Sequence, residues 1–292
     1  MEGGGASFTD SAAWLVNENL SPSVRDQVMQ NLFDPNAGIG VSFLRNPMGA
    51  SDLTRTEYTY DDDASDKSDS SLPHFSIGHD LADVLPLTKA ARRLNPSLHL
   101  MMTGWSPPAW MKDNNNLVGG DLLPQFYPHF TNYYVKTIQA YEAQGVPIDY
   151  VALNNEPTCC GTINYPSLHP TSAEMITILK NFWFPAWSQN NIQTKIFLLD
   201  FNWCNSGLVT PMLQDSTVRT SPFVAGVAWH GYCGDPSEQT TIHDQFGTEA
   251  FETERTGSIA NSPTVQHNRD MNLMIGVFRN WGRKSYRAVA FC

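Results

Sequence analysis

Short, almost uninterrupted apolar runs dominate this sequence, and longer stretches with helical spacing separate them. The runs are four to seven residues long. A strand that is buried on both faces gives such a run, and parallel sheets bury both faces of their strands. We predict strands over residues 41–45, 98–103, 150–154, 196–200, 224–230, 250–253 and 287–292. The pattern therefore favours a parallel sheet.

Helical periodicity fills the segments between the predicted strands. Apolar residues recur every three or four positions over 130–141, ahead of Gly145, and glycine is typical of helix ends. The stretch from Thr171 to Glu174 resembles a capped helix start, and a helix over 85–94 ends ahead of Pro96. Repeated strand–helix alternation over 292 residues predicts an α/β fold, a (β/α)8 barrel forming one domain over 1–292. The doubly wound alternative lacks its Gly-x-Gly-x-x-Gly fingerprint.

The charge balance narrows the class of partner. The chain has 29 acidic residues against 18 Lys and Arg, a formal net charge of -11. This balance repels phosphate backbones, so we expect no nucleic-acid partner. No apolar run approaches the roughly 18 residues of a membrane span. A low-charge composition rich in Trp and Tyr suits uncharged polar ligands such as sugars.

Two carboxylates follow predicted strands directly, Glu156 after YVALNN and Glu254 after AFET. A (β/α)8 barrel carries its chemistry at the carboxyl ends of its strands. Glycoside cleavage needs two carboxyl groups at one bond: one protonates the leaving oxygen, and the other attacks the anomeric carbon or steers water to it. Each Glu alone also fits a solvated strand-end carboxylate. The pair at predicted strands four and seven is the more specific observation.

Two further observations bear on this assignment. Glu252 is a rival nucleophile, because strand alternation places it on the same side as Glu254. The histidines at 74, 79, 99, 129, 169, 243 and 267 have no ligand spacing, so we predict no catalytic metal and no cofactor.

The segments GIGVSFLRNPMGASDLTRTEYTYDD, TGWSPPAWMK, the Asn-Glu-Pro strand and FETERTGS together resemble glycoside hydrolase family 30. The opening EGGGASFTDSAAWLV resembles the first strand of that family, and NWGRKSYRAVAF resembles the approach to its eighth. Gly4 departs from the aromatic residue usual in that opening. The resemblance implies a TIM barrel with an accompanying β-sandwich. We expect that β-sandwich to be largely absent here and the barrel to be incomplete at its eighth strand.

The resemblance also implies roles for individual residues. Glu156 becomes the general acid/base and Glu254 the nucleophile of a retaining mechanism. The implied substrate-binding and supporting residues are Asn155, Arg45, Asp52, Trp105, His230 and Tyr232. Asn155 is expected to bind the sugar 2-hydroxyl, and Arg45 and Tyr232 to hold Glu254 ionised and aimed. The other three are expected to line the sugar subsite.

Several of these residues also have a purely structural interpretation. Arg45 would pair with a loop acid, and Asp52 would be a turn or cap residue. Trp105 would be an aromatic residue that only packs against its neighbours. His230 and Tyr232 would be strand-end residues whose polar groups are hydrogen-bonded within the protein. These alternatives stay open at the level of the sequence.

Likeness within the family guides the expected substrate. The stretches RNPMGASDL, MKDNNNLVGG and Asn-Glu-Pro-Thr-Cys-Cys most resemble the endo-β-1,6-galactanase branch. The alternatives are a glucosylceramidase-like or β-1,6-glucanase activity, or an inactive truncated barrel that binds carbohydrate. We expect a secreted monomer acting on a polysaccharide or glycoconjugate, although no signal segment opens this chain.

Two further features concern loops. The five cysteines are an odd number, and a pair such as Cys160 with Cys204 would be bridged if their loops meet; free or buried thiols are the alternative. The acidic, Ser-rich stretch 61–71 is expected to be an exposed loop.

Overall fold

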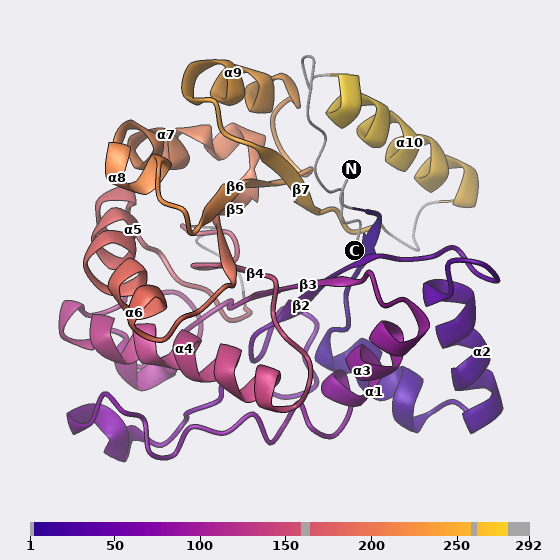
Figure 1. Cartoon of the computed structure of the whole chain (residues 1–292), viewed down its shortest axis with the longest axis horizontal. Helices are drawn as coiled ribbons and strands as arrows, with labels where there is room; N and C mark the ends of the chain where they lie inside the picture. Colours follow the sequence, from indigo (N-terminus) through magenta and orange to yellow (C-terminus); the bar gives the residue numbers. More distant parts are fainter. Residues whose placement is uncertain (1–2, 159–163, 258–261, 280–292) are drawn as a thin grey trace.

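The computed structural model describes residues 3–158, 164–257 and 262–279. Within them, parallel strands pair in chain order, each with the next, and form one curled sheet (Figure 1). These strands are β1 (Gly5–Ala6), β2 (Phe43–Pro47), β3 (His99–Thr103), β4 (Tyr150–Ala152), β5 (Lys195–Asn202), β6 (Val224–His230) and β7 (Ala250–Glu254). Parallel neighbours need a crossover connection after each strand, and helices supply most of these crossovers.

The helices lie around the outside of the sheet (Figure 1). They are α1 (Asp10–Glu18), α2 (Pro22–Phe33), α3 (Val84–Leu94), α4 (Tyr127–Ala143), α5 (Ser172–Ile178), α6 (Phe184–Gln189), α7 (Ser206–Gln214), α8 (Ser216–Arg219), α9 (Ser237–Phe246) and α10 (Pro263–Arg279). Among these helices, none combines the length and the hydrophobicity that crossing a bilayer requires. Strands inside and helices outside make the predicted β/α barrel.

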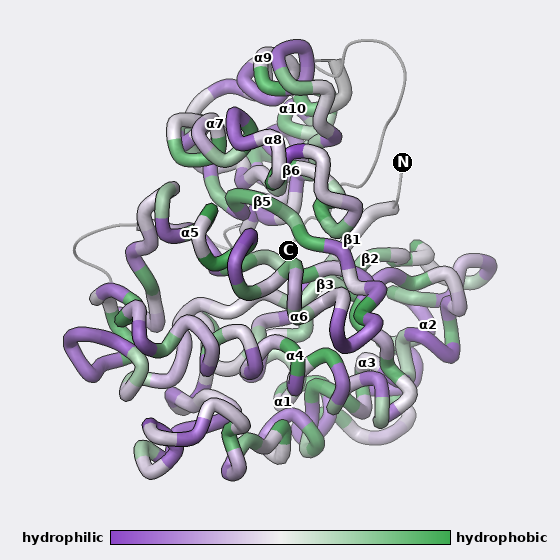
Figure 2. Tube along the Cα trace, turned by 60° about the vertical axis from the view of Figure 1, so that its left-hand side comes forward, coloured by the Kyte–Doolittle hydropathy of each residue, from purple (hydrophilic) through white to green (hydrophobic). Residues whose placement is uncertain are grey.

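Side chains of the strands sort into two hydrophobic layers. An inner cluster takes one residue from each of β2 to β7: Phe43, Met101, Ala152, Phe197, Ala228 and Phe251. A larger outer cluster joins the opposite strand faces to the helices. Figure 2 shows hydrophobic colouring along β5, which is buried almost throughout. Burial on both faces explains why the strands read as continuous apolar runs.

Most predicted elements form close to their expected positions. Strand β6 occupies the predicted 224–230, whereas β2 lies two residues later than predicted and β5 continues to Asn202. Helix α5 has the predicted cap, in which Thr171 Oγ1 accepts the Glu174 N–H and the Glu174 carboxylate accepts the Thr171 N–H. The strand predicted over 287–292 lies outside the described residues.

The prediction of an exposed acidic loop over 61–71 is wrong in part. Asp61 and Asp66 are both buried. The carbonyl oxygen of Asp61 accepts the indole N–H of Trp110 at 2.8 Å, and Asp66 accepts the backbone N–H of His74 at 3.0 Å. Burial and the neighbouring Asp66 raise the pKa of Asp61 to about 7. This segment is therefore packed against the β3–α4 connection.

The cysteine prediction also needs correction. Cys204 forms a disulfide with Cys233, with 5.5 Å between the two Cα atoms. The two residues lie in the connections that follow β5 and β6, and adjacent parallel strands bring these connections together. Cys160, the partner considered from the sequence, lies outside the described residues.

Candidate active site

A pocket of about 400 Å³ opens at the carboxyl ends of the strands. Its walls come from the segments that end or follow β2 to β7. The lining residues are Asp52, Leu53, Trp105, Asn155, Glu156, Tyr165, Asn202, Tyr232, Glu254 and Thr256. Six of the eight residues singled out in the sequence are in this set. The other two, Arg45 and His230, are buried and contact its walls directly.

The two glutamates of the predicted pair share this pocket. Glu254 is the last residue of β7, and Glu156 follows β4. A carboxylate oxygen of each lies within 4.8 Å of the other and of a ring nitrogen of His230. The two side chains are 11% and 14% exposed for Glu156 and Glu254 respectively. The carboxylates are therefore close together, nearly buried and open to the pocket.

Arg45 connects the groups beneath the pocket. It projects from β2, and its side chain is 2% exposed. The guanidinium donates to Glu254 Oε2 at 2.7 Å and to Asp200 Oδ2 at 2.8 Å. It also donates to Asn155 Oδ1 at 2.6 Å, and its central carbon lies 5.1 Å from the ring centre of Trp105. One buried cation thus orients polar side chains from β5, β7 and the segment after β4.

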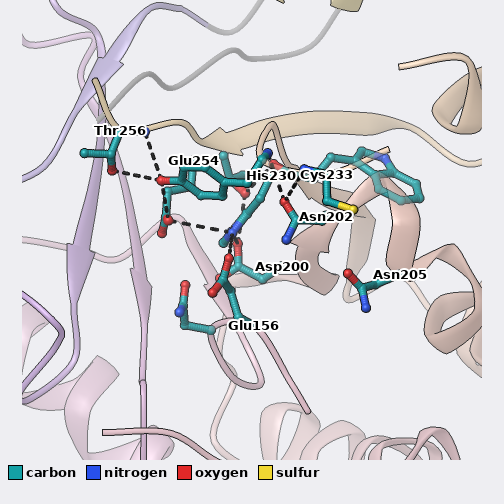
Figure 3. Close-up of polar contacts among 12 residues, drawn as sticks. Glu156, Asp200, Asn202, Asn205, His230, Cys233, Glu254 and Thr256 are labelled. Atoms are coloured by element: carbon teal, nitrogen blue, oxygen red, sulfur yellow. Dashed lines mark hydrogen bonds and ion pairs between the residues drawn. The ribbon is translucent and has the colours of Figure 1, made fainter. Parts of the chain in front are cut away.

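His230, at the end of β6, contacts three carboxylates (Figure 3). Nδ1 lies 3.0 Å from Glu156 Oε1 and 3.8 Å from Glu254 Oε1, and Nε2 lies 3.1 Å from Asp200 Oδ1. Burial lowers the pKa of the imidazole, but the surrounding carboxylates outweigh burial and raise this pKa to about 10. A protonated ring donates from both nitrogens. In this form His230 pairs with the carboxylates of Glu156, Asp200 and Glu254.

Asp200 completes this network from β5. Leu199 and Asp200 have left-handed backbone, with φ of 72° and 57°, where the pairing of β5 with β6 shifts register. The extra residue reverses the side-chain alternation and places Asp200 in the barrel interior. Burial raises the pKa of its carboxyl, but Arg45 and His230 outweigh burial and hold the pKa below its ordinary value. Asp200 therefore stays ionised between two cations.

A second bulge separates the two glutamates of β7. Trp229 pairs with Glu252 and His230 with Glu254, so Thr253 is inserted between two paired positions. The expectation that both glutamates point to one side is wrong for this reason. Glu252 is buried and does not line the pocket.

The surroundings of Glu252 are apolar. A Cβ atom on Gly231 would lie 2.8 Å from Glu252 Oε1 and 3.1 Å from Leu273, which belongs to α10. Neither carboxyl oxygen of Glu252 has a hydrogen-bond partner within the part of the chain that the structure describes. Burial raises the pKa of Glu252 well above its ordinary value. The rival nucleophile is therefore buried outside the pocket lining.

Tyr232 holds the other oxygen of Glu254. Its hydroxyl donates to Glu254 Oε1 at 2.9 Å and accepts the backbone N–H of Thr256 at 2.9 Å. Burial of the hydroxyl and the charge of Glu254 raise the pKa of Tyr232 above its ordinary value, so it remains a donor. Arg45 and Tyr232 together occupy both carboxylate oxygens of Glu254.

The rim of the pocket carries Asp52 and Tyr165. Asp52 is exposed, but the surrounding protein and the charge of Glu254 raise the pKa of its carboxyl. Burial and Glu156 raise the pKa of Tyr165 to about 12. The Tyr165 hydroxyl can therefore donate a hydrogen bond to a ligand near neutral pH, whereas Asp52 accepts or donates according to its protonation state.

Sequence reasoning missed three residues of the site. The sequence identifies Asp200 as a polar residue at the end of a predicted strand but gives it no role, because the bulge in β5 that turns it inward has no sequence signal. Asn202 accepts the backbone N–H groups of Tyr232 and Cys233 at 3.0 and 3.2 Å, and it lies beyond the predicted end of its strand. Tyr165 is in a connection without periodicity and gives no sequence signal.

A parallel β/α barrel with two close glutamates at the ends of its fourth and seventh strands has the architecture of a barrel glycosidase. A sequence profile of the glycosyl hydrolase family 30 TIM-barrel domain matches residues 1–265. The chain belongs to this family.

Relatives and a solved structure agree with this membership. The chain is 31% identical to an endo-1,6-beta-D-glucanase of Neurospora crassa, over 96% of this chain and 58% of that protein. It is 28% identical to the lysosomal acid glucosylceramidase of Mus musculus, over 80% of this chain and 46% of that protein. The structure of an endo-beta1,6-glucanase superposes with a TM-score of 0.87 at 27% identity, over 100% of this chain and 66% of that chain. The chain thus spans about half to two thirds of the length of these relatives.

Proposed function

We propose that this protein is a retaining β-glycosidase. The observation that carries the proposal is the proximity of Glu156 and Glu254, whose nearest carboxylate oxygens lie within 4.8 Å of each other. Retaining enzymes hold their two carboxyl groups about 5–5.5 Å apart, whereas inverting enzymes leave about 6.5–9.5 Å for a water molecule. The spacing here supports direct attack by one carboxylate on the sugar.

In the first step, Glu254 attacks the anomeric carbon while Glu156 protonates the departing glycosidic oxygen. Arg45 and Tyr232 each hold one oxygen of Glu254, so the nucleophile is oriented before substrate arrives. Binding both oxygens fixes the plane of the carboxylate. The product of this step is a glycosyl ester on Glu254 with the anomeric configuration inverted.

In the second step, Glu156 takes a proton from water, which attacks the same carbon and releases Glu254. The second inversion restores the β configuration. Asn155 Oδ1 accepts from Arg45, which directs the amide NH2 group of Asn155 toward the sugar 2-hydroxyl. A contact of this kind strengthens as the oxocarbenium-like transition state develops. Trp105 supplies an apolar face for the sugar ring.

For the substrate, we propose a β-1,6-linked glucan. The endo-1,6-β-glucanases among the relatives reported above support glucan, and none of those relatives supports the galactan preference expected from the sequence. Glucose and galactose units differ in the orientation of one hydroxyl, so the rim residues Asp52 and Tyr165 are the candidates for distinguishing them. The solvent-exposed disulfide of Cys204 and Cys233 supports an extracellular location.

The test is digestion of a glycan panel by the purified chain. The panel holds β-1,6-glucan, β-1,6-galactan, xylan and glucosylceramide, with products identified by mass spectrometry and their first-formed anomer by NMR. We expect β-anomeric oligosaccharides from β-1,6-glucan. Release from galactan alone would replace the substrate assignment and keep the mechanism. An α-anomer as first product would overturn the mechanism.

Matched variants identify the nucleophile. Glu254→Gln should lower kcat at least about 1000-fold, and Glu156→Gln should lower it about 100- to 10,000-fold. Glu252→Gln makes the same chemical change two residues from Glu254 and should retain activity. If the folded wild-type chain releases nothing from any glycan but binds one, it is a carbohydrate-binding barrel rather than an enzyme.

A further inference from the structure

The Cys204–Cys233 disulfide lies at the edge of the pocket. Cys204 belongs to the short 3-10 turn Trp203–Asn205 that follows β5, and Cys233 lies three residues after the end of β6. The bond joins residues 29 positions apart, and both cysteines are exposed to solvent. Figure 3 places Cys233 and Asn202 beside the cluster formed by Glu254 and His230.

The disulfide belongs to a wider set of contacts that fix one turn. Asn202 Oδ1 accepts the N–H groups of Tyr232 and Cys233, and the Cys204 N–H donates to the Cys233 carbonyl at 3.2 Å. The turn also approaches its neighbour closely, since a Cβ atom on Gly234, whose φ is 91°, would lie 2.5 Å from the Cys204 nitrogen. The turn over 231–234 is therefore seated directly on the segment after β5.

This turn carries Tyr232, whose hydroxyl contacts Glu254 at 2.9 Å. The residue is 40% exposed, so packing restrains it less than it restrains Arg45 on the other oxygen of Glu254. The guanidinium carbon of Arg255 lies 5.0 Å from the centre of the Tyr232 ring, and Thr256 contacts the Tyr232 hydroxyl through its backbone N–H and its own hydroxyl. The position of the hydroxyl therefore depends on the backbone of the turn.

We propose that the Cys204–Cys233 disulfide is a positioning element of the active site, which holds the Tyr232 hydroxyl against Glu254 and makes turnover sensitive to reduction. The inference rests on the proposed glycosidase function. Reduction by a dithiol breaks the S–S bond, transfers two electrons and two protons to the cysteines, and oxidises the dithiol to its own disulfide. The freed turn then allows the Tyr232 hydroxyl to leave Glu254.

A double-mutant cycle tests whether the disulfide acts through this hydroxyl. Reduction of the wild type, or the double variant Cys204→Ser/Cys233→Ser, should lower kcat about three- to tenfold, part of the loss expected for Tyr232→Phe. Adding the double variant to Tyr232→Phe should cause little further loss, because the hydroxyl is already absent. Losses that multiply in the combined variant would overturn the proposal. The serine variant should be insensitive to dithiol although Cys159, Cys160 and Cys292 remain.

A readout independent of turnover separates this inference from the proposed function. Amide hydrogen exchange at Tyr232, Cys233 and Thr256 should accelerate on reduction, since these N–H groups bond to Asn202 or to the Tyr232 hydroxyl. Exchange in β3 should not change. Unchanged exchange at the three amides, with a fully reduced disulfide, would overturn the proposal even if the chain is active. If the chain hydrolyses no glycan but shows the exchange effect, the positioning role of the disulfide is supported and the proposed glycosidase function is overturned.

Discussion

Arg45 and Glu254 are 209 positions apart in the chain, yet a guanidinium nitrogen of Arg45 lies 2.7 Å from Glu254 Oε2 in the fold. The contact joins β2 to β7 across the barrel interior, and the same guanidinium pairs with Asp200. A buried arginine is stable only when its charge is matched and its donors are used. The carboxylates of Glu254 and Asp200 match this charge, so Arg45 stabilises the barrel interior and helps to orient Glu254.

Arg45→Lys should lower kcat/KM about 100-fold or more. A lysine ammonium keeps the charge, but it cannot reach Glu254, Asp200 and Asn155 together because it lacks the planar fork of arginine. Steady-state kinetics on the preferred glycan measures the loss. Arg93→Lys, an exposed position on α3, is the control and should match the wild type. Comparable activity of the two variants would contradict the orienting role of Arg45.

The charge on His230 predicts a pH-dependent stability. Its pKa is raised from about 6.5 when unfolded to about 10 when folded. A raised pKa stabilises the fold fully below pH 6.5, and this contribution disappears as pH rises toward 10. His230→Gln should therefore cost more free energy of unfolding at pH 6 than at pH 9.5, with the difference reaching a few kcal/mol at about 1.4 kcal/mol per pH unit.

Urea unfolding at the two pH values measures this difference. The exposed His267→Gln variant is the matched control for a histidine outside the site. A cost for His230→Gln that does not change with pH would show that the imidazole is neutral in the folded protein.

Substitution of the buried Glu252 by glutamine should raise the stability of the protein, whereas substitution of His230 should lower it. Its raised pKa means that the folded protein binds a proton that the unfolded chain releases above about pH 4.5. Wild-type stability should therefore fall as pH rises from 4.5. Glu252→Gln removes this proton linkage, so the variant should gain stability relative to the wild type between pH 5 and pH 8. Thermal melts across this range test the sign, and a constant difference would argue against a neutral Glu252.

Lys112 joins the two aromatic walls of the pocket. Its buried amino group donates to Ser106 Oγ at 3.1 Å and to the carbonyl oxygen of Ser167 at 2.7 Å. Ser106 directly follows Trp105 in the chain, and Ser167 lies close after Tyr165. Burial lowers the pKa of Lys112 to about 7.

Lys112→Met should raise KM about five- to tenfold and change kcat little, because these hydrogen bonds position walls rather than reacting groups. Lys67→Met, on the exposed surface, is the matched control. A fall in kcat at unchanged KM would assign Lys112 to the chemical step instead.

Local pattern was sufficient for much of the fold. The apolar runs that became β2 to β7 are buried on both faces, as the strands of a parallel sheet covered by helices are. The capping box at Thr171 and Glu174 formed as predicted, because it depends on four consecutive residues alone. Glu156 and Glu254 were found because they directly follow such runs, and the barrel brings the carboxyl ends of its strands together.

The amino-acid sequence alone thus determined a parallel β/α architecture, its order of elements and the strand-end position of its paired carboxylates. The tertiary structure decided which acidic side chains face the pocket. Alternation groups Glu252 with Glu254, but a bulge in β7 separates them, and a bulge in β5 turns Asp200 into the barrel interior. It also decided that Cys204 pairs with Cys233. Alternation along a strand is a local property, whereas a bulge and a disulfide depend on how that strand meets its neighbours in the curled sheet.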